Sequence, residues 1–256
     1  VENYLSSLTI STDYRDLEDC RLVLECVLEE IDIKKAVYKK ITKVVSHEII
    51  IASNTSAIPI SELQQYVIHP ERFIGMHWAE PAFNTRFMEI IQGDKTAAEV
   101  SEWVYKLAYY WGKEPTLLKK DMKGFITNRL MYAASREALS LIEGGVISVE
   151  DADKCFRYDF GSWITLMGIF RRMDFWGLED YKVIFDTIFP ALDNREDVPE
   201  IMQRMVEIHA RGIQNCYGLY HYTAEEAREW DDAFAVFNKD IAHLAALYPS
   251  EVSDPH

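Results

Sequence analysis

The sequence lacks several features that would place it in a specialised class of protein. No apolar run approaches the roughly 20 residues that a membrane-spanning helix needs. The first residues are neither basic nor followed by an apolar stretch, which argues against a signal peptide. The four cysteines, Cys20, Cys26, Cys155 and Cys216, are scattered without metal-ligand spacing. We therefore expect reduced thiols, no bound metal, no membrane association and a cytoplasmic location.

Positive charge is also scarce. The chain has 27 basic and 42 acidic residues, and its net charge is -15. Such a protein is repelled by nucleic acid and by anionic membranes, so we expect neither as a partner, although a local basic pocket can still hold one anionic ligand. Hydrophobic residues make up 48% of the 256 residues, which supports a sizeable core and argues against a disordered chain.

Short apolar runs that end in polar residues mark the first half of the chain. They predict strands at residues 8–12, 22–27, 49–52, 72–76 and 87–91, and a brief strand at 116–118. Helical periods between them predict helices at 32–45, 61–66 and 97–111. This alternation predicts an α/β fold with buried parallel strands.

After residue 121 only helical periods remain. They predict helices at residues 125–143, 164–175, 178–189, 199–211 and 225–247. A further helix is predicted to begin at Ser148, where a capping-box pattern starts. We place the domain boundary near residues 119–123. The prediction is thus an α/β domain over residues 1–120 and an all-α domain over residues 121–256.

Three polar side chains accompany the strands. Ser56 and His77 follow apolar runs and Glu89 lies inside one, so we expect all three at the carboxyl edge of a parallel sheet. A hydroxyl, an imidazole and a carboxylate together can bind an alcohol, take its proton and orient the base. Alone, Ser56 is more often a turn residue and His77 a satisfied core histidine. Glu89 is the strongest signal, because a buried carboxylate needs a partner and His77 is the natural one.

Six sequence blocks, in order, resemble the L-3-hydroxyacyl-CoA dehydrogenase family, which includes relatives of the gulonate and carnitine dehydrogenase type. The blocks lie at residues 24–29, 52–56, 72–77, 87–93, 124–130 and 137–139. The resemblance covers residues 8–160 well and the last third loosely. It implies a Rossmann-type doubly wound sheet followed by an all-helical dimerisation domain, NAD as cofactor, and a homodimer formed through the helical domain.

The resemblance also implies roles for residues. His77 would be the general base that removes the hydroxyl proton, and Glu89 would hold its imidazole. Ser56 and Asn128 would hydrogen-bond the substrate. Asn128 taken by itself is equally compatible with a helix cap.

The residues expected to bind the cofactor match those of the family only in part. Glu29 and Lys34 resemble family residues near the nicotinamide ribose, and Ser56 lies on the same side. Glu80 stands where the family has an asparagine beside the nicotinamide. No Gly-x-Gly-x-x-Gly, the loop that holds the NAD pyrophosphate, occurs in the chain. We therefore expect a piece of a longer enzyme, with a partial sheet whose first strands are missing.

These features lead to one leading hypothesis and two alternatives. The leading hypothesis is NAD-dependent oxidation of the 3-hydroxyl of an L-3-hydroxyacyl-CoA, a reaction of fatty acid metabolism. The first alternative is a dehydrogenase of a free 3-hydroxy acid, because Trp163 and the pair Arg171–Arg172 suggest a pocket for a short or acidic substrate. The second is a non-catalytic scaffold, which the missing phosphate loop favours and the full set of site residues disfavours.

Overall fold

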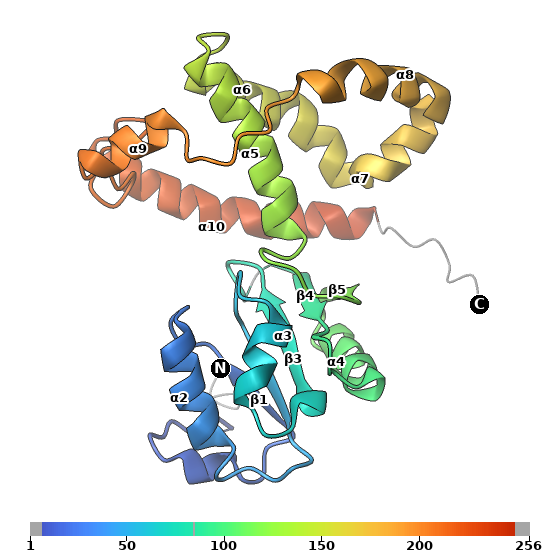
Figure 1. Ribbon diagram of the computed structural model, residues 1–256. Coiled ribbons are helices and arrows are strands. Elements are labelled where there is room, and N and C mark those ends of the chain that lie inside the picture. The colour runs from blue at the N-terminus through green and yellow to red at the C-terminus, as the bar shows by residue number, and fades with distance from the viewer. Residues whose placement is uncertain (1–6, 84, 249–256) are drawn as a thin grey trace. The chain divides into compact units, whose positions relative to one another are not determined.

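A computed structural model describes residues 7–83 and 85–248 (Figure 1). The chain divides after Arg129 into two compact units. We call them the α/β unit and the helical unit. The predicted α/β sheet followed by an all-helical part is confirmed.

The α/β unit is built on one five-stranded sheet. Its strands are adjacent in chain order: β1 (Leu22–Glu25), β2 (Ile50–Ser53), β3 (Phe73–Trp78), β4 (Phe87–Ile91) and β5 (Glu114–Leu118). β1, β2 and β3 are parallel, β4 is antiparallel to β3, and β5 is parallel to β4. The prediction of parallel strands is therefore wrong for β4. Residues 79–86 join β3 to β4, and so short a connection allows a reversal but not a parallel crossover.

Helices cover both faces of this sheet (Figure 1). α2 (Ile31–Ile41) and α3 (Ile60–Leu63) pack on one face, and α4 (Ala98–Tyr110) packs on the other. Short 3-10 turns lie at Tyr14–Leu17, Gln64–Tyr66 and Pro70–Arg72. Each face has its own apolar cluster, with Tyr38 and Leu63 in the first and Val104 and Ala108 in the second. Apolar side chains thus hold the sheet in place from both sides.

The strand predicted at residues 8–12 is wrong. These residues form no strand, and the side chains of Leu8 and Ile10 are 64% and 91% exposed. A β-prone run becomes a strand only when another strand satisfies its backbone groups, and the run at 8–12 has no such neighbour among the described residues. β-propensity alone is therefore insufficient here.

The helical unit continues from a helix that begins in the α/β unit. This helix is α5 (Thr127–Glu143). It is followed by α6 (Val149–Cys155), a π-helical turn (Phe156–Phe160), α7 (Gly161–Trp176), α8 (Leu178–Ile188), a 3-10 turn (Phe189–Ala191), α9 (Glu200–Glu207) and α10 (Ala224–Leu247). The predicted start at Ser148 is confirmed, because its side chain accepts a hydrogen bond from the Asp151 amide at 3.1 Å. α7 is kinked at Gly168, where φ is 70°.

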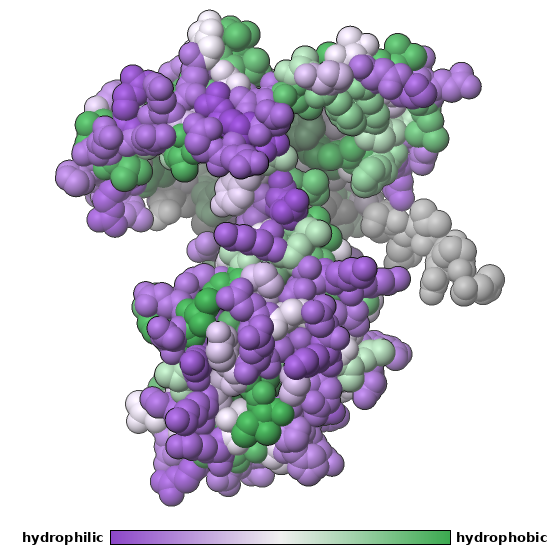
Figure 2. Space-filling view, in the orientation of Figure 1, coloured by the Kyte–Doolittle hydropathy of each residue, from purple (hydrophilic) through white to green (hydrophobic). Residues whose placement is uncertain are grey.

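The helical unit leaves most of its apolar side chains in contact with solvent. Among its described residues only Ala152 and Ala227 are buried. Figure 2 shows hydrophobic residues gathered on α7 and α8, where Phe170 and Phe175 are 81% and 73% exposed. Nowhere in residues 7–83 and 85–248 is a helix both long and apolar enough to cross a bilayer.

Candidate active site

The centre of the candidate site is a histidine–carboxylate pair on neighbouring strands. The antiparallel register of β3 and β4 places His77 directly opposite Glu89. Nδ1 of His77 lies 2.5 Å from Oε2 of Glu89, and the two side chains are 14% and 1% exposed. An ionised carboxylate only accepts hydrogen bonds, so the contact requires the imidazole proton on Nδ1. Nε2 of His77 is then the nitrogen that can accept a proton from a substrate.

His77 and Glu89 are in contact, as predicted from the need of a buried carboxylate for a partner, but the expected direction of the strand that carries Glu89 is wrong. Glu89 does not lie past the end of a parallel strand. It is the third residue of β4, and cross-strand pairing brings it to His77. The ring of Phe125 packs beside the imidazole, with the ring centroids 5.8 Å apart.

Glu89 also holds the start of α5. Its Oε1 accepts hydrogen bonds from the amides of Ile126 at 2.8 Å and Thr127 at 3.0 Å. Burial acts to raise the pKa of Glu89, but the bond from His77 and these two backbone bonds outweigh it and lower the pKa. The carboxylate therefore stays ionised at neutral pH, as the orienter of a basic histidine must.

Ser56 and Asn128 lie together near the start of α5. The side-chain amide of Asn128 donates to the backbone carbonyl of Ser56 at 2.9 Å. Ser56 is exposed and Asn128 half-buried. Both side chains belong to the α/β unit, as do His77 and Glu89. Their roles in substrate binding stay a prediction.

Glu29 fixes the loop that carries Ser56. Its Oε1 accepts hydrogen bonds from the hydroxyl of Thr55, the amide of Ser56 at 3.0 Å and the amide of Ala57 at 3.1 Å. Burial acts to raise the pKa of Glu29, but the bond from Thr55 and the charge of Lys34 lower it. Thr55, which sequence reasoning missed, is fully buried. Position-specific hydrogen bonding of this kind leaves no pattern in a single sequence.

Lys34, expected near the cofactor, is 1% exposed and lies beneath Glu29. Its Nζ is 2.9 Å from Oε1 of Glu25 and 3.2 Å from Oε2 of Glu29. Sequence reasoning missed Glu25, the last residue of β1, although it lies in an apolar run of the sequence as Glu89 does. The rule that a buried carboxylate needs a partner identifies both.

Glu80 lies in the loop that follows the end of β3 at Trp78, and it is exposed. A buried lysine holds this loop, because Nζ of Lys113 donates to the carbonyls of Ala82 and Thr85, both at 2.6 Å. The same Nζ lies 4.9 Å from the ring centroid of Trp78, and burial lowers the pKa of Lys113. A part in cofactor binding for Glu80 stays a prediction.

The groups at this edge of the sheet suit one end of a dinucleotide. A partly exposed carboxylate on Glu29 and the exposed Ser56 can hydrogen-bond ribose hydroxyls and an amide. The chain has no glycine-rich loop that could hold phosphates. The described residues therefore fit the nicotinamide end of NAD and not its pyrophosphate.

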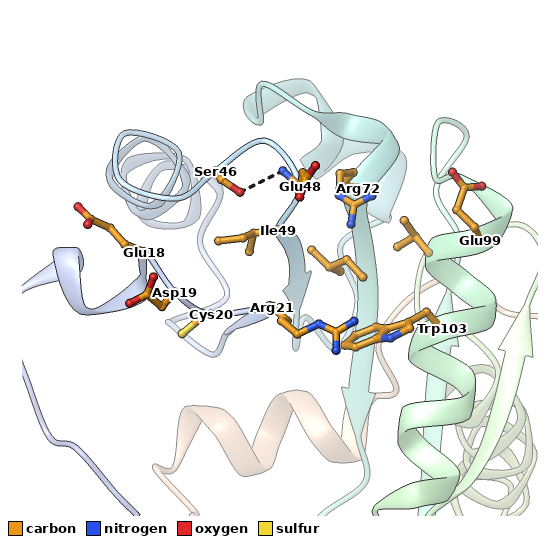
Figure 3. A pocket seen from close by; sticks show the side chains of 12 residues that line it. Glu18, Asp19, Cys20, Arg21, Ser46, Glu48, Ile49, Arg72, Glu99 and Trp103 are labelled. Atoms are coloured by element: carbon orange, nitrogen blue, oxygen red, sulfur yellow. Dashed lines mark hydrogen bonds between the residues drawn. The ribbon is translucent and has the colours of Figure 1, made fainter.

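A separate cavity of about 620 Å³ lies away from this site (Figure 3). Its lining includes Arg21, Ile49 and Arg72, which immediately precede β1, β2 and β3, together with Glu99 and Trp103 of α4. It therefore opens at the amino ends of the parallel strands, opposite to the edge that carries the site. In the part of the chain that the structure describes, no group of three or more His, Cys, Asp or Glu side chains is arranged to hold a metal.

Two family models together match most of the chain, up to residue 222. The 3-hydroxyacyl-CoA dehydrogenase NAD binding domain matches residues 1–122, and the 3-hydroxyacyl-CoA dehydrogenase C-terminal domain matches residues 124–222. The chain belongs to the 3-hydroxyacyl-CoA dehydrogenase family. It is therefore an oxidoreductase of a family that uses NAD, and the resemblance found in the sequence is confirmed.

Individual relatives of this family member differ in the substrates they are named for. The chain is 38% identical to 5-formyl-3-hydroxy-2-methylpyridine 4-carboxylate 5-dehydrogenase of Mesorhizobium japonicum, over 81% of its own length and 67% of the relative's. A solved structure of an enzyme of that name, described as an NAD+-dependent dismutase, matches with a TM-score of 0.88 and 33% identity, over 94% of this chain and 77% of the other. The structure of (S)-3-hydroxybutyryl-CoA dehydrogenase from Ralstonia eutropha matches with a TM-score of 0.71 and 28% identity, over 87% and 77%.

Proposed function

We propose that the enzyme oxidises a hydroxyl group with His77 as the general base. Nε2 of His77 accepts the hydroxyl proton while a hydride leaves the carbon that bears it. Glu89 holds the imidazole through Nδ1 and stabilises the imidazolium that forms. The observation that carries this proposal is the 2.5 Å contact between Nδ1 of His77 and the buried Glu89. The chemistry that NAD+ supplies when bound is acceptance of the hydride.

Ser56 and Asn128 orient the substrate in this proposal. Their side chains lie on one short stretch of surface, because the Asn128 amide is bonded to the Ser56 carbonyl. A hydroxyl and an amide can hold both the reacting oxygen and a neighbouring carbonyl or carboxylate. Glu29 supports the nicotinamide end of the cofactor, and Lys34 acts through Glu29 because it is buried.

For the substrate we propose a small carboxylic acid that carries an oxidisable formyl or hydroxyl group. The pyridine carboxylate dehydrogenase supports this choice by its 38% identity and by the TM-score of 0.88 of the solved enzyme of that name. With a formyl group, the reacting species is the hydrated aldehyde. One of its hydroxyls gives its proton to His77, the hydride leaves carbon, and a carboxylic acid results.

A second candidate is the oxidation of an L-3-hydroxyacyl-CoA. It is favoured by the 3-hydroxybutyryl-CoA dehydrogenase structure, whose TM-score of 0.71 extends over 87% of this chain. The same His77–Glu89 chemistry serves both substrates. Following NADH at 340 nm with the pyridine aldehyde acid, free 3-hydroxybutyrate and 3-hydroxybutyryl-CoA separates the candidates. Turnover of the thioester alone would overturn the choice of a small free acid.

The role of His77 is tested in the complete gene product that carries this chain. His77→Asn should lower kcat by about 10²–10⁴-fold, the usual contribution of a positioned general base, while the Kd for NAD stays nearly unchanged. His47→Asn is the matched control, because His47 is exposed and precedes β2 at the opposite edge of the sheet. Full turnover in His77→Asn would show that the base is another group.

We also propose that the helical unit forms a homodimer. Its described residues include only two buried side chains, and its helices expose large apolar groups such as Phe170 and Phe175. Exposed apolar faces of this kind are covered in stable proteins, most simply by a second copy.

A further inference from the structure

Four polar side chains form a buried network at the carboxyl ends of β1 and β2. Oε1 of Glu25 accepts from Nζ of Lys34 at 2.9 Å and from the Val27 amide at 2.7 Å. Oε2 of Glu25 accepts from the hydroxyls of Tyr38 and Ser53, both at 2.7 Å. The side chain of Glu25 is fully buried, and burial raises the pKa of Tyr38, which therefore donates as a neutral phenol.

This network continues to the loop that carries Ser56. Lys34 contacts Glu25 on one side and Glu29 on the other, at 2.9 and 3.2 Å. With one oxygen of Glu29 held by Lys34, the other oxygen receives the Thr55 hydroxyl and the amides of Ser56 and Ala57. One ammonium thus links a buried carboxylate in the sheet to the carboxylate that fixes the loop.

We propose that Glu25 and Lys34 are positioning residues that set the place of Ser56 through Glu29. The proposal rests on the proposed function, in which Ser56 contacts the substrate. The charge arrangement supports it, because a buried ion is stable only when it is paired and fully hydrogen-bonded. Removing the ammonium leaves Glu25 buried without its counter-ion and removes the charge that holds Glu29 in place.

The competing role for Lys34 is direct contact with the cofactor. The geometry disfavours it, because Lys34 is 1% exposed and its ammonium already contacts two carboxylates. A direct contact would require the side chain to leave both partners. The two roles differ in what they predict: a positioning role acts through Ser56, whereas a direct role affects the cofactor independently of Ser56.

Hydrogen exchange in the complete gene product tests the structural part. Lys34→Met should speed amide exchange at Ser56 and Ala57, because their acceptor Glu29 is no longer held. Exchange in β4 should stay unchanged. Lys39→Met is the matched control, since it makes the same substitution at an exposed position of the same helix. Unchanged exchange at Ser56 and Ala57 in Lys34→Met would overturn the proposal.

A double-variant cycle tests the functional part. Lys34→Met should lower kcat/KM for the alcohol or aldehyde substrate by about 10–100-fold, as loss of an outer partner of a functional group commonly does. In the double variant with Ser56→Ala, Lys34→Met should lower kcat/KM by less than about threefold beyond the loss in Ser56→Ala alone, because both substitutions act on one contact. Effects that multiply in the double variant would overturn the proposal.

A third variant protects the test against a folding failure. If Lys34→Met does not fold, Glu29→Gln serves in the exchange experiment, because the side chain of Glu29 is 38% exposed and its Oε1 is the acceptor of the Ser56 and Ala57 amides. Failure of the proposed function has a different signature. His77→Asn would then retain turnover, while faster exchange at Ser56 and Ala57 in Lys34→Met would still support the network.

Discussion

At the scale of single residues, Glu89 joins two tasks that are usually separate. One oxygen orients His77 and the other accepts the first amides of α5. The negative charge suits both, because it stabilises an imidazolium and also the positive end of a helix dipole. A substitution at this residue therefore changes both the chemistry and the position of the helix start.

We expect Glu89→Gln to lower kcat by about 100-fold or more, within the range for general-base catalysis. The amides of Ile126 and Thr127 need an acceptor, so the amide oxygen of Gln faces them and its NH2 faces Nδ1 of His77. The imidazole proton then moves to Nε2, and the base cannot accept a proton. Steady-state kinetics check this. Glu71→Gln is the control, since Glu71 forms an exposed pair with His69; equal losses in both variants would contradict the argument.

The pH dependence of stability follows from the lowered pKa of Glu89. Its ordinary value is 4.5, and the folded protein holds it lower. The folded state therefore binds fewer protons, so the stabilisation is fully present above pH 4.5 and is lost as pH falls through the lowered value. The wild type and Glu89→Gln should differ in their free energy of unfolding, measured in urea. This difference should become smaller as pH falls below 4.5. A difference in the free energy of unfolding that grows on acidification would contradict the predicted direction of the pH dependence.

At the scale of elements, the approach of α3 to the sheet depends on one glycine. Gly75 lies in β3 between Ser53 of β2 and Ile91 of β4. A Cβ atom here would lie 2.7 Å from Cδ1 of Ile60 and 2.9 Å from Cβ of Ile91. The strand that carries His77 can therefore sit under α3 only with glycine at this position.

Gly75→Ala should destabilise the α/β unit by about 1–3 kcal/mol, the usual effect of overpacking a core. Chemical denaturation measures the change. Adding Ile60→Val removes the nearest atom, Cδ1, and should restore part of the loss. No recovery in the double variant would mean that the contacts that remain at 2.9 Å, with Cγ1 of residue 60 and Cβ of Ile91, set the effect.

At the scale of the whole molecule, the two units differ in where their apolar groups lie. The sheet unit buries two clusters, one on each face, whereas the described part of the helical unit buries only Ala152 and Ala227. Apolar surface left exposed lowers stability unless a partner covers it. The proposed homodimer supplies that cover.

If the helical unit dimerises, the Tm of its unfolding should rise with protein concentration, because association favours the folded state by mass action. Calorimetry over a hundredfold range of concentration measures this. Phe170→Glu, on exposed α7, should remove the dependence and give a monomer in sedimentation. A Tm that is independent of concentration in the wild type would contradict the dimer.

The sequence by itself determined the family, the α/β order of the first half, the helical second half and the partnership of His77 with Glu89. These follow from apolar periodicity, from blocks of residues in a fixed order, and from the need of a buried carboxylate for a partner. The domain limits and the roles of Ser56, Asn128, Glu29, Lys34 and Glu80 stay predictions.

Only the tertiary structure decided the absence of a strand at residues 8–12 and the links from Glu25 through Lys34 to the loop of Ser56. A β-prone run forms a strand only where neighbouring strands satisfy its backbone groups, and hydrogen bonds such as that from Ser53 to Glu25 join residues far apart in the chain. Local sequence patterns report propensity and burial. They do not report which distant groups meet, and that meeting determines where each buried charge finds its partner.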